Sequence, residues 1–304
     1  MKTKESLTLL KKACINMNKL YIMVGLPGSG KSTIAKECEL ENKIIISSDD
    51  IRAEISNVND QTKNKEVFEI LNLRVKMNLA KGKNVIFDAT NINYKKRMEI
   101  IKNNKEYFCE CIFVATPYEE CLKRNSNRER KVPEKVIEKM YKNFYVPQAF
   151  EGFKRIIVIY PDRAKEKVTF ASLKDIEQDN KYHQYTVKEH CNKVYQYMKQ
   201  KTKNKNLILA SRLHDIGKLK TKTFVNTKGE ITDQAHFYGH ENVGAYDSLF
   251  FKKTDRLDVA KYIQWHMLLK NNLSEKRMMH YKNLLGEKFM DDLKLLNEAD
   301  NTCK

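Results

Sequence analysis

The stretch KLYIMVGLPGSGKSTIAKECEL (residues 19–40) decides the fold of the first half of this 304-residue chain. An apolar run, KLYIMV, precedes a glycine-rich loop, GLPGSGKST, and a helical pattern follows the loop. A loop in this position can direct backbone N–H groups at phosphate oxygens. It therefore predicts a nucleoside triphosphate site built from Gly25, Gly28, Ser29, Gly30, Lys31, Ser32 and Thr33.

Each residue type in this loop has a physical reason to be there. The glycines let the backbone bend around phosphates, Lys31 reaches the β- and γ-phosphate oxygens, and Ser32 binds Mg²⁺. A chance glycine-rich turn is the alternative, but both the motif and its position after an apolar run match a phosphate-binding loop. We expect ATP or GTP to bind here together with Mg²⁺.

The first half as a whole has the pattern of an α/β fold. Helical patterns alternate with short apolar runs and are clearest over 62–81 and 94–105. This alternation predicts a parallel sheet wrapped by helices. The expected strands are 20–25, 43–47, 84–88, 108–115 and 155–160.

Polar residues follow two of these runs and suggest where a phosphate acceptor binds. SSDDIR (47–52) places Asp49, Asp50 and Arg52 at the carboxyl end of a strand, where sites in such sheets open. A carboxylate there can accept the proton of an attacking hydroxyl, and an arginine can hold a phosphate on the acceptor. The alternative is that these carboxylates cap the next helix. IFDATN (86–91) offers Asp88, Thr90 and Asn91 at the same edge.

A basic segment, KRNSNRER (123–130), precedes the next helical pattern. Its arginines, Arg124, Arg128 and Arg130, are suited to closing over a phosphoryl group during transfer. A solvated basic surface is the alternative interpretation of this segment.

These motifs, in this order, resemble the 5′-kinase domain of bacteriophage-type polynucleotide kinases over residues 18–160. The resemblance implies that Asp49 is the general base and that Arg52 contacts the 3′-phosphate of the acceptor. It also implies that Arg128 is a catalytic lid arginine and that Arg124 is a second clamp on the ATP phosphates. The phosphatase domain that usually accompanies this kinase carries a DxDxT signature, which this chain lacks.

Composition adds a polyanion as the expected partner. The formal net charge is +18, and both parts are basic: residues 1–178 hold 34 Lys and Arg against 24 Asp and Glu, and residues 179–304 hold 23 against 15. This balance favours nucleic acid, although a solvated lysine-rich surface is the alternative. Seven scattered cysteines without CxxC pairs fit reduced thiols, and no apolar run reaches the roughly 18 residues of a membrane span. We expect a cytoplasmic protein without a membrane segment.

Histidine separates the two halves, because all seven histidines lie in the last 122 residues. There the pattern is helical, with a small hairpin or loop expected at FVNTKGEITD (224–233). A mixture of imidazole and carboxylate is typical of Mn, Fe, Co or Ni and of two-metal hydrolytic sites. A single helical histidine is more often a satisfied polar residue than a ligand. The expected helices are 185–203, 206–216, 239–251, 255–269 and 274–300.

The motifs YTVKEH (185–190), LHDIGK (213–218) and NEAD (297–300) together resemble the HD phosphohydrolase superfamily, and HFYGHENVGA (236–245) resembles the HD domains of CCA-adding tRNA nucleotidyltransferases. The match runs over residues 180–304. It implies that Asp215 bridges two metal ions and that Lys218 steadies a phosphate or a water in the catalytic site. The implied metal ligands are His190, His214, Asp215, His240, His266 and Asp300.

We therefore predict a P-loop polynucleotide kinase domain over 1–162, a linker over 163–180 and an all-α HD phosphohydrolase domain over 181–304. Cleavage of RNA by transesterification leaves a 5′-hydroxyl and a 2′,3′-cyclic phosphate, and this chain has chemistry for both ends. The predicted function is healing of RNA ends, such as those of a broken tRNA, or of DNA ends, with a separate RNA ligase as partner. The sequence indicates no oligomeric state.

Two alternatives remain open. The chain is a small-molecule or nucleoside kinase with an HD nucleotide phosphatase domain, or it is an RNA-binding module with a degenerate HD domain. The intact set of histidines and aspartates argues against degeneracy.

Overall fold

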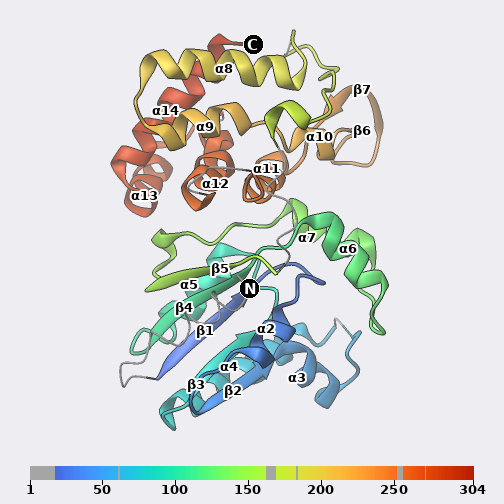
Figure 1. Cartoon of the computed structure of the whole chain (residues 1–304), viewed down its shortest axis with the longest axis vertical. Coiled ribbons are helices and arrows are strands. Elements are labelled where there is room, and N and C mark those ends of the chain that lie inside the picture. The colour runs from blue at the N-terminus through green and yellow to red at the C-terminus, as the bar shows by residue number, and fades with distance from the viewer. Residues whose placement is uncertain (1–17, 61, 162–168, 183, 252–255, 271) are drawn as a thin grey trace. The chain divides into compact units, whose positions relative to one another are not determined.

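The computed structural model describes residues 18–60, 62–161, 169–182, 184–251, 256–270 and 272–304 (Figure 1). The chain forms two compact units, one from Met1–Ile137 with Pro147–Arg163 and one from Glu138–Val146 with Ala164–Lys304. The start of the predicted first domain, 1–17, and part of the predicted linker, 162–168, lie outside the described residues.

The first unit is built on a five-stranded parallel sheet with the order β2-β3-β1-β4-β5. All five predicted strands are confirmed to within one residue at each end. β1 is central and fully buried beyond its first residue, because its run of apolar side chains faces helices on both sides of the sheet. The strands are β1 (Lys19–Val24), β2 (Lys43–Ser47), β3 (Asn84–Asp88), β4 (Phe108–Val114) and β5 (Arg155–Ile159).

The strand order places the functional edge of this sheet. After β1 the chain moves to β2 and β3 on one side and then to β4 and β5 on the other, so the order reverses at β1. Ligands bind outside the carboxyl ends of parallel strands at such a point. The helices of this unit are α2 (Lys31–Glu37), α3 (Ser48–Ile55), α4 (Asn64–Ala80), α5 (Tyr94–Lys102) and α6 (Tyr118–Ser126), followed by α7 (Glu134–Lys142), which ends in the second unit.

The second unit is mostly helical, as predicted, and the residues 224–233 form part of a small antiparallel hairpin, β6 (Thr223–Val225) and β7 (Ile231–His236). Its core includes Val194, Leu213, Val243 and Leu293, one from each of four helices. The remaining elements are α8 (Val187–Lys201), α9 (Lys205–Leu213), α10 (Lys218–Thr221), α11 (His240–Ser248), α12 (Arg256–Trp265), the 3-10 turn η3 (His266–Leu269), α13 (Glu275–Leu285) and α14 (Glu287–Thr302).

Two segments outside the predicted HD residues also pack in the second unit. In residues 138–146, the Tyr141 hydroxyl donates a short hydrogen bond to Asp247, and the backbone N–H of Val146 donates to Gln264 at 2.9 Å. Ahead of α8, the short 3-10 turn η2 (Phe170–Ser172) leads to a stretch that ends at the buried Gln178. Neither attachment was predicted from the sequence pattern.

Candidate functional sites

The phosphate-binding loop lies between β1 and α2 and is held from several sides. Its Gly25 N–H donates to Thr90 O at 3.1 Å, and the Thr116 hydroxyl, just beyond β4, donates to Ser29 O at 2.8 Å. Gly28 has φ of 80°, and a Cβ there would lie 2.3 Å from Cys121 O. Only glycine allows this approach of the loop to α6. The loop is therefore shaped before any nucleotide binds.

Ser32 and Asp88 form the pair that fits Mg²⁺. The Ser32 hydroxyl donates to Asp88 Oδ2 at 2.8 Å, and Asp88 ends β3 beside the loop. Burial raises the pKa of Asp88, although the positive charge of Lys31 and the Ser32 hydrogen bond act against that rise. Because Mg²⁺ prefers hydroxyl and carboxylate oxygens, these two side chains suit the ion that accompanies a triphosphate. The sequence placed Asp88 at this edge without assigning it a role.

A buried ion pair holds the β3–α5 turn that carries Asp88. Arg97 makes two hydrogen bonds to the Glu151 carboxylate, at 2.6 and 2.7 Å, and a third to Asn91 O at 2.7 Å. Asn91 has φ of 46°, and its amide donates to Met23 O in β1 at 2.8 Å. Removing either charge would leave the other buried and unpaired, which is costly. This bracing fixes Asp88 relative to the loop.

Lys31 belongs to the loop, and two arginines lie near it. Burial lowers the pKa of Lys31; the positive charge of Arg128 adds to this effect, while the carboxylates of Asp88 and Asp49 oppose it. Arg124 donates to Glu120 at 3.1 Å and approaches Ser29 O at 3.5 Å. Arg124 is thus beside the loop, and Arg128 is close enough to Lys31 for their charges to interact.

Asp49 lies in the first turn of α3 and forms ion pairs with two guanidinium groups. Arg52 donates to Asp49 Oδ1 at 3.1 Å, and Arg130 forms a short ion pair with Asp49 Oδ2. Ser47 caps the same helix by accepting from the N–H groups of Asp49 and Asp50. The cap is therefore a serine, and the Asp49 side chain is left to pair with Arg52 in the same helix and with Arg130 outside it.

The second site depends on helix ends that converge in the second unit. Thr186 and Glu189 form a capping box that begins α8, which places His190 in the first turn of that helix. His214 and Asp215 follow α9 directly, and His240 begins α11. His266 begins η3 after α12, and Asp300 lies in the last turns of α14.

A close packing of two backbones brings these ends together. A Cβ on Gly217 would lie 2.0 Å from His240 O and 2.7 Å from Gly244 N. Glycine at position 217 therefore lets the turn that carries His214 and Asp215 lie directly against α11.

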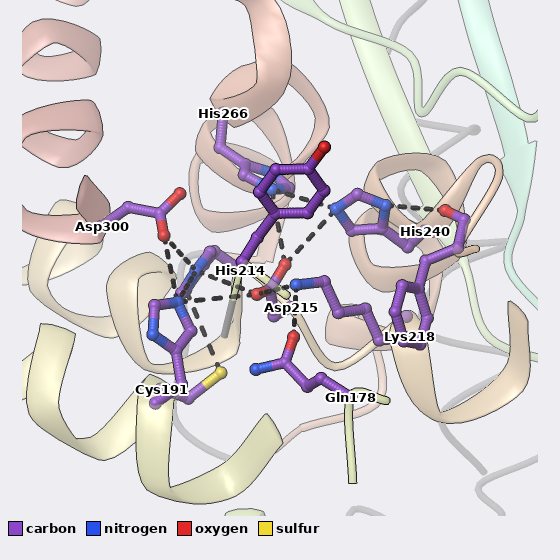
Figure 2. Close-up of polar contacts among 12 residues, drawn as sticks. Gln178, Cys191, His214, Asp215, Lys218, His240, His266 and Asp300 are labelled. Atoms are coloured by element: carbon purple, nitrogen blue, oxygen red, sulfur yellow. Dashed lines mark hydrogen bonds and ion pairs between the residues drawn. The ribbon is translucent and has the colours of Figure 1, made fainter. Parts of the chain in front are cut away.

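Asp215 lies between two groups of ligand atoms, as Figure 2 shows. On one side, Asp215 Oδ2 is 3.6 Å from His190 Nε2 and 3.4 Å from His214 Nε2, and those two nitrogens are 3.2 Å apart. Asp300 Oδ1 completes this group at 3.0 Å from His190 Nε2 and 3.8 Å from His214 Nε2.

On the other side, Asp215 Oδ1 is 3.3 Å from His240 Nε2 and 3.6 Å from His266 Nε2, which are 3.3 Å from each other. Ligands bound at about 2.1 Å from one metal ion are separated by roughly 3.0–3.4 Å. Both groups are close to these separations. The two oxygens of Asp215 thus point into two different candidate metal positions.

The chemistry of the donor set also fits metal ions. In all four histidines the other ring nitrogen, Nδ1, faces a backbone carbonyl, which can only accept a hydrogen bond. Nδ1 must then carry the proton, which leaves the Nε2 lone pairs facing one another and the carboxylates. A divalent cation between them satisfies every lone pair, and this fixed orientation is typical of metal-binding histidines. The carbonyls belong to Cys303, Ser211, Phe237 and Ile263, 2.6–3.2 Å from Nδ1.

The site attracts positive charge. Burial disfavours an ionised Asp215, yet the neighbouring Lys218 and His214 hold its pKa well below the usual range. Burial likewise acts against a charged His214, but Asp215 and other neighbours raise its pKa well above the usual range. The negative charge that favours a protonated histidine in this buried cluster also favours binding of a divalent cation.

Two lysines and a glutamine support the carboxylates. Lys218 donates to Asp215 Oδ2 and to Gln178 Oε1, both at 2.7 Å. Lys270 forms a short ion pair with Asp300 Oδ2, so the Oδ1 atom of Asp300 faces the histidines. The sequence predicted Lys218 but missed Gln178 and Lys270, because neither lies in a motif.

Comparisons with known proteins agree with this division. Residues 20–147 match the AAA domain family, and residues 182–303 match the HD domain family. The chain joins a P-loop kinase-like domain to an HD domain. In this protein the phosphate-binding loop belongs to the P-loop domain, and the histidine–aspartate cluster belongs to the HD domain.

Among curated proteins, the chain is similar to the L-seryl-tRNA(Sec) kinase of Methanococcus maripaludis, with 34% identity over 139 residues, 42% of this chain and 53% of the relative. It is also similar to the protein kti12 of Schizosaccharomyces pombe, with 29% identity over 145 residues, 42% of this chain and 52% of the relative. The chain thus spans about half the length of these relatives.

Two solved structures of the Pnkp1/Rnl/Hen1 complex, one described as an RNA repair complex, also have similar chains. One gives a TM-score of 0.39 at 27% identity, covering 44% of this chain and 46% of that chain. The other gives 0.35 at 22% identity, covering 55% and 51%. Across the residues that the structure describes, the helices are too short or too polar to cross a membrane.

Proposed function

We propose that the chain is a bifunctional end-healing enzyme for nucleic acid, with RNA as the preferred substrate. Its P-loop domain transfers the γ-phosphoryl group of ATP to a 5′-hydroxyl end. Its HD domain hydrolyses a 2′,3′-cyclic or terminal phosphate with the help of divalent metal ions. The observation that carries the proposal is that one chain holds two kinds of site. In one, the phosphate-binding loop contacts Asp88 through Ser32, and Asp49 is paired with Arg130. The other is a cluster of histidines and aspartates that fits two metal ions.

In the kinase reaction, each side chain has a physical role. The loop and Lys31 bind the triphosphate, and Ser32 with Asp88 would hold Mg²⁺, which neutralises phosphate charge when bound. Asp49 accepts the proton of the 5′-hydroxyl as its oxygen bonds to the γ-phosphorus, and ADP leaves. Arg128, close to Lys31, offsets the charge that develops on the transferring group.

In the hydrolysis reaction, the HD domain orients a phosphoester against its buried ligands. The fitting metals are those that accept imidazole and carboxylate, namely Mn, Fe, Co or Ni, and they supply Lewis-acid activation of water and phosphate when bound. Asp215, supported by Lys218, joins the two positions, and Asp300 completes one of them. The positive charge of Lys218, beside Asp215, favours binding of the phosphate there.

The decisive experiment offers the chain an RNA cut in its anticodon loop, with a 5′-hydroxyl and a 2′,3′-cyclic phosphate, in the presence of ATP, Mg²⁺ and Mn²⁺. We expect the γ-phosphate label to appear on the 5′ end and the cyclic phosphate to open or disappear. DNA with the same ends and free nucleosides are the comparison substrates. Preferred labelling of nucleosides would contradict the proposal and support a small-molecule kinase.

A second candidate acceptor comes from the similarity to L-seryl-tRNA(Sec) kinase, which is 34% identical over the matched region. A kinase of that kind would phosphorylate a hydroxyl on an aminoacyl group attached to tRNA rather than a 5′ end. Incubation with intact seryl-tRNA and with a 5′-hydroxyl oligonucleotide, each with labelled ATP, separates the two. Alkaline release of the aminoacyl group then shows which part carries the label.

A further inference from the structure

Both oxygens of Asp49 are occupied by arginines, and the two arginines differ in how they are held. Oδ1 accepts from Arg52 at 3.1 Å, and Oδ2 is paired with Arg130. Each guanidinium group that pairs with a carboxylate occupies part of its acceptor capacity and stabilises its negative charge, which makes the carboxylate a weaker acceptor for a hydroxyl proton. Release of one of the two arginines would therefore make Asp49 a better proton acceptor.

Arg52 is fixed inside the protein. Its side chain is 5% exposed, and its guanidinium also donates to Asn64 Oδ1 at 2.6 Å and approaches Ser48 O at 3.5 Å. Moving it would break contacts in two helices, α3 and α4, and would leave a charge buried without its partners. Arg52 is thus suited to orienting Asp49.

Arg130 is held more loosely, at the solvent side of Asp49. Its side chain is 24% exposed, and Asp49 itself is 48% exposed. Its other contacts are to the turn after α3, at 2.9 Å to Val58 O and 3.4 Å to Asn59 Oδ1. It follows Arg124 and Arg128 in the chain, yet those two lie toward the loop and Lys31. Arg130, by contrast, pairs with the predicted general base.

We propose that Arg130 binds the phosphate of the acceptor strand that lies next to the 5′-hydroxyl, and that this exchange frees Asp49 Oδ2 for the hydroxyl proton. The inference rests on the proposed kinase function. A guanidinium that pairs with a carboxylate pairs equally well with a phosphate diester anion, because both present two oxygens to its planar fork. The acceptor phosphate then competes with Asp49 for Arg130, so acceptor binding and activation of the base are linked.

This arrangement explains how the chain discriminates among acceptors. A 5′-hydroxyl compound without an adjacent phosphate leaves Arg130 on Asp49 and the base engaged. A strand with the phosphate draws Arg130 away. This proposal gives Arg130 the contact with the acceptor phosphate that the family resemblance gives to Arg52, and it leaves Arg52 to position the base.

The test uses two 5′-hydroxyl oligonucleotides, one with an ordinary first phosphodiester and one with an uncharged methylphosphonate at that linkage. For the unaltered protein we expect kcat/KM to be about 10- to 100-fold higher with the diester, since a charged hydrogen-bonded contact is lost in the analogue. Arg130→Ala should lose most of that preference through a higher KM for the diester, with KM for ATP unchanged.

Lys131→Ala is the matched control, because it removes a neighbouring exposed positive charge. This variant should keep the preference for the diester. If Arg130→Ala also keeps it, or raises KM for ATP as much as KM for the diester, the assignment of Arg130 is wrong while the kinase function stands. If the unaltered protein labels neither oligonucleotide, the proposed kinase function itself fails, and the inference fails with it.

Discussion

The two sites differ in how far they are assembled before substrate arrives. In the HD domain, six candidate ligand residues converge, their four histidines have rings fixed by backbone carbonyls, and all six side chains are buried. In the P-loop domain the loop is shaped, but Asp49 is half exposed and paired with two arginines, of which only Arg130 changes partner in the proposed reaction. Hydrolysis by bound metal needs a rigid cage, whereas phosphoryl transfer between two bound molecules needs groups that change partners.

The physical reason for this difference is the cost of buried charge. Lone pairs gathered in a buried cluster repel one another and are tolerable only with a compensating cation. Exposed groups such as Asp49 and Arg130 can exchange partners at little cost because water screens their charges. Four predictions, from the largest expected effect to the smallest, test this contrast.

The largest effect tests whether the two sites are separate. Asp215→Ala removes the carboxylate shared by both metal positions, so we expect loss of phosphoester hydrolysis by roughly 10³-fold or more with kinase activity unchanged. Lys31→Ala or Asp49→Ala should do the reverse. Both activities are measured on the same doubly end-labelled RNA. Loss of both activities from either substitution, in a protein with unchanged melting temperature, would break the contrast.

The second prediction concerns Asp88, which burial penalises when it is charged. Asp88→Asn should reduce phosphoryl transfer by about 10²- to 10³-fold, because it removes a carboxylate suited to Mg²⁺. The variant should nevertheless melt at a higher temperature than the unaltered protein near neutral pH.

The sign follows from the raised pKa of Asp88. A carboxyl whose pKa is higher in the folded state binds its proton more tightly there, so its contribution to stability is present at low pH and lost as pH rises through the folded pKa. The advantage of Asp88→Asn should therefore grow from pH 4 toward neutrality. Thermal melts across this range, without nucleotide, measure it; a constant difference would contradict the argument.

The third prediction separates the two metal positions. Lys270→Ala frees Asp300 to rotate away from the histidines, so binding at the position shared by His190 and His214 should weaken by about 10- to 100-fold. The position at His240 and His266 should be unaffected. When the chelator concentration is raised, the two metal ions should therefore be lost in two steps, and these steps should lie further apart in chelator concentration than in the unaltered protein.

Lys294→Ala is the control for Lys270→Ala, since Lys294 lies on the same helix as Asp300 and pairs with Asp291 at the surface. It should leave the two steps unchanged. If Lys270→Ala weakened metal binding equally at both positions, the proposal that Lys270 acts through Asp300 on one position only would be wrong.

The smallest effect concerns Gln178, which accepts from Lys218 at 2.7 Å. Gln178→Ala removes one neutral partner of the lysine, and we expect kcat/KM for hydrolysis to fall by about 2- to 10-fold with metal content unchanged. Gln200→Ala, an exposed change on α8, should have no effect. A loss of metal in Gln178→Ala would show that the lysine holds Asp215 only with this support.

Much of this molecule was predictable from local pattern. The five strands, the P-loop and the helical second half followed from apolar runs and glycine positions, because secondary structure and loop shape depend on neighbours in the chain. The HD ligands followed from a resemblance, and the structure brings all six together. The roles of individual side chains in catalysis stay predictions.

Other features depend on residues far apart in the sequence. Arg130 reaches Asp49 across 81 positions of the numbering, Lys270 pairs with Asp300, and Gln178 enters the HD site from a stretch that pattern marks as a linker. Residues 138–146 join the second unit although their sequence continues a helix of the first. No periodicity encodes such contacts.

The sequence by itself determined which chemical groups this protein carries and which strands and helices present them, since those depend on residue type and short-range spacing. The tertiary structure alone decided which charges face each other: which arginines pair with the predicted general base, and which lysines pair with the carboxylates beside the histidines. The physical reason is that electrostatic and hydrogen-bond energies depend on distance in space, which folding sets independently of distance along the chain.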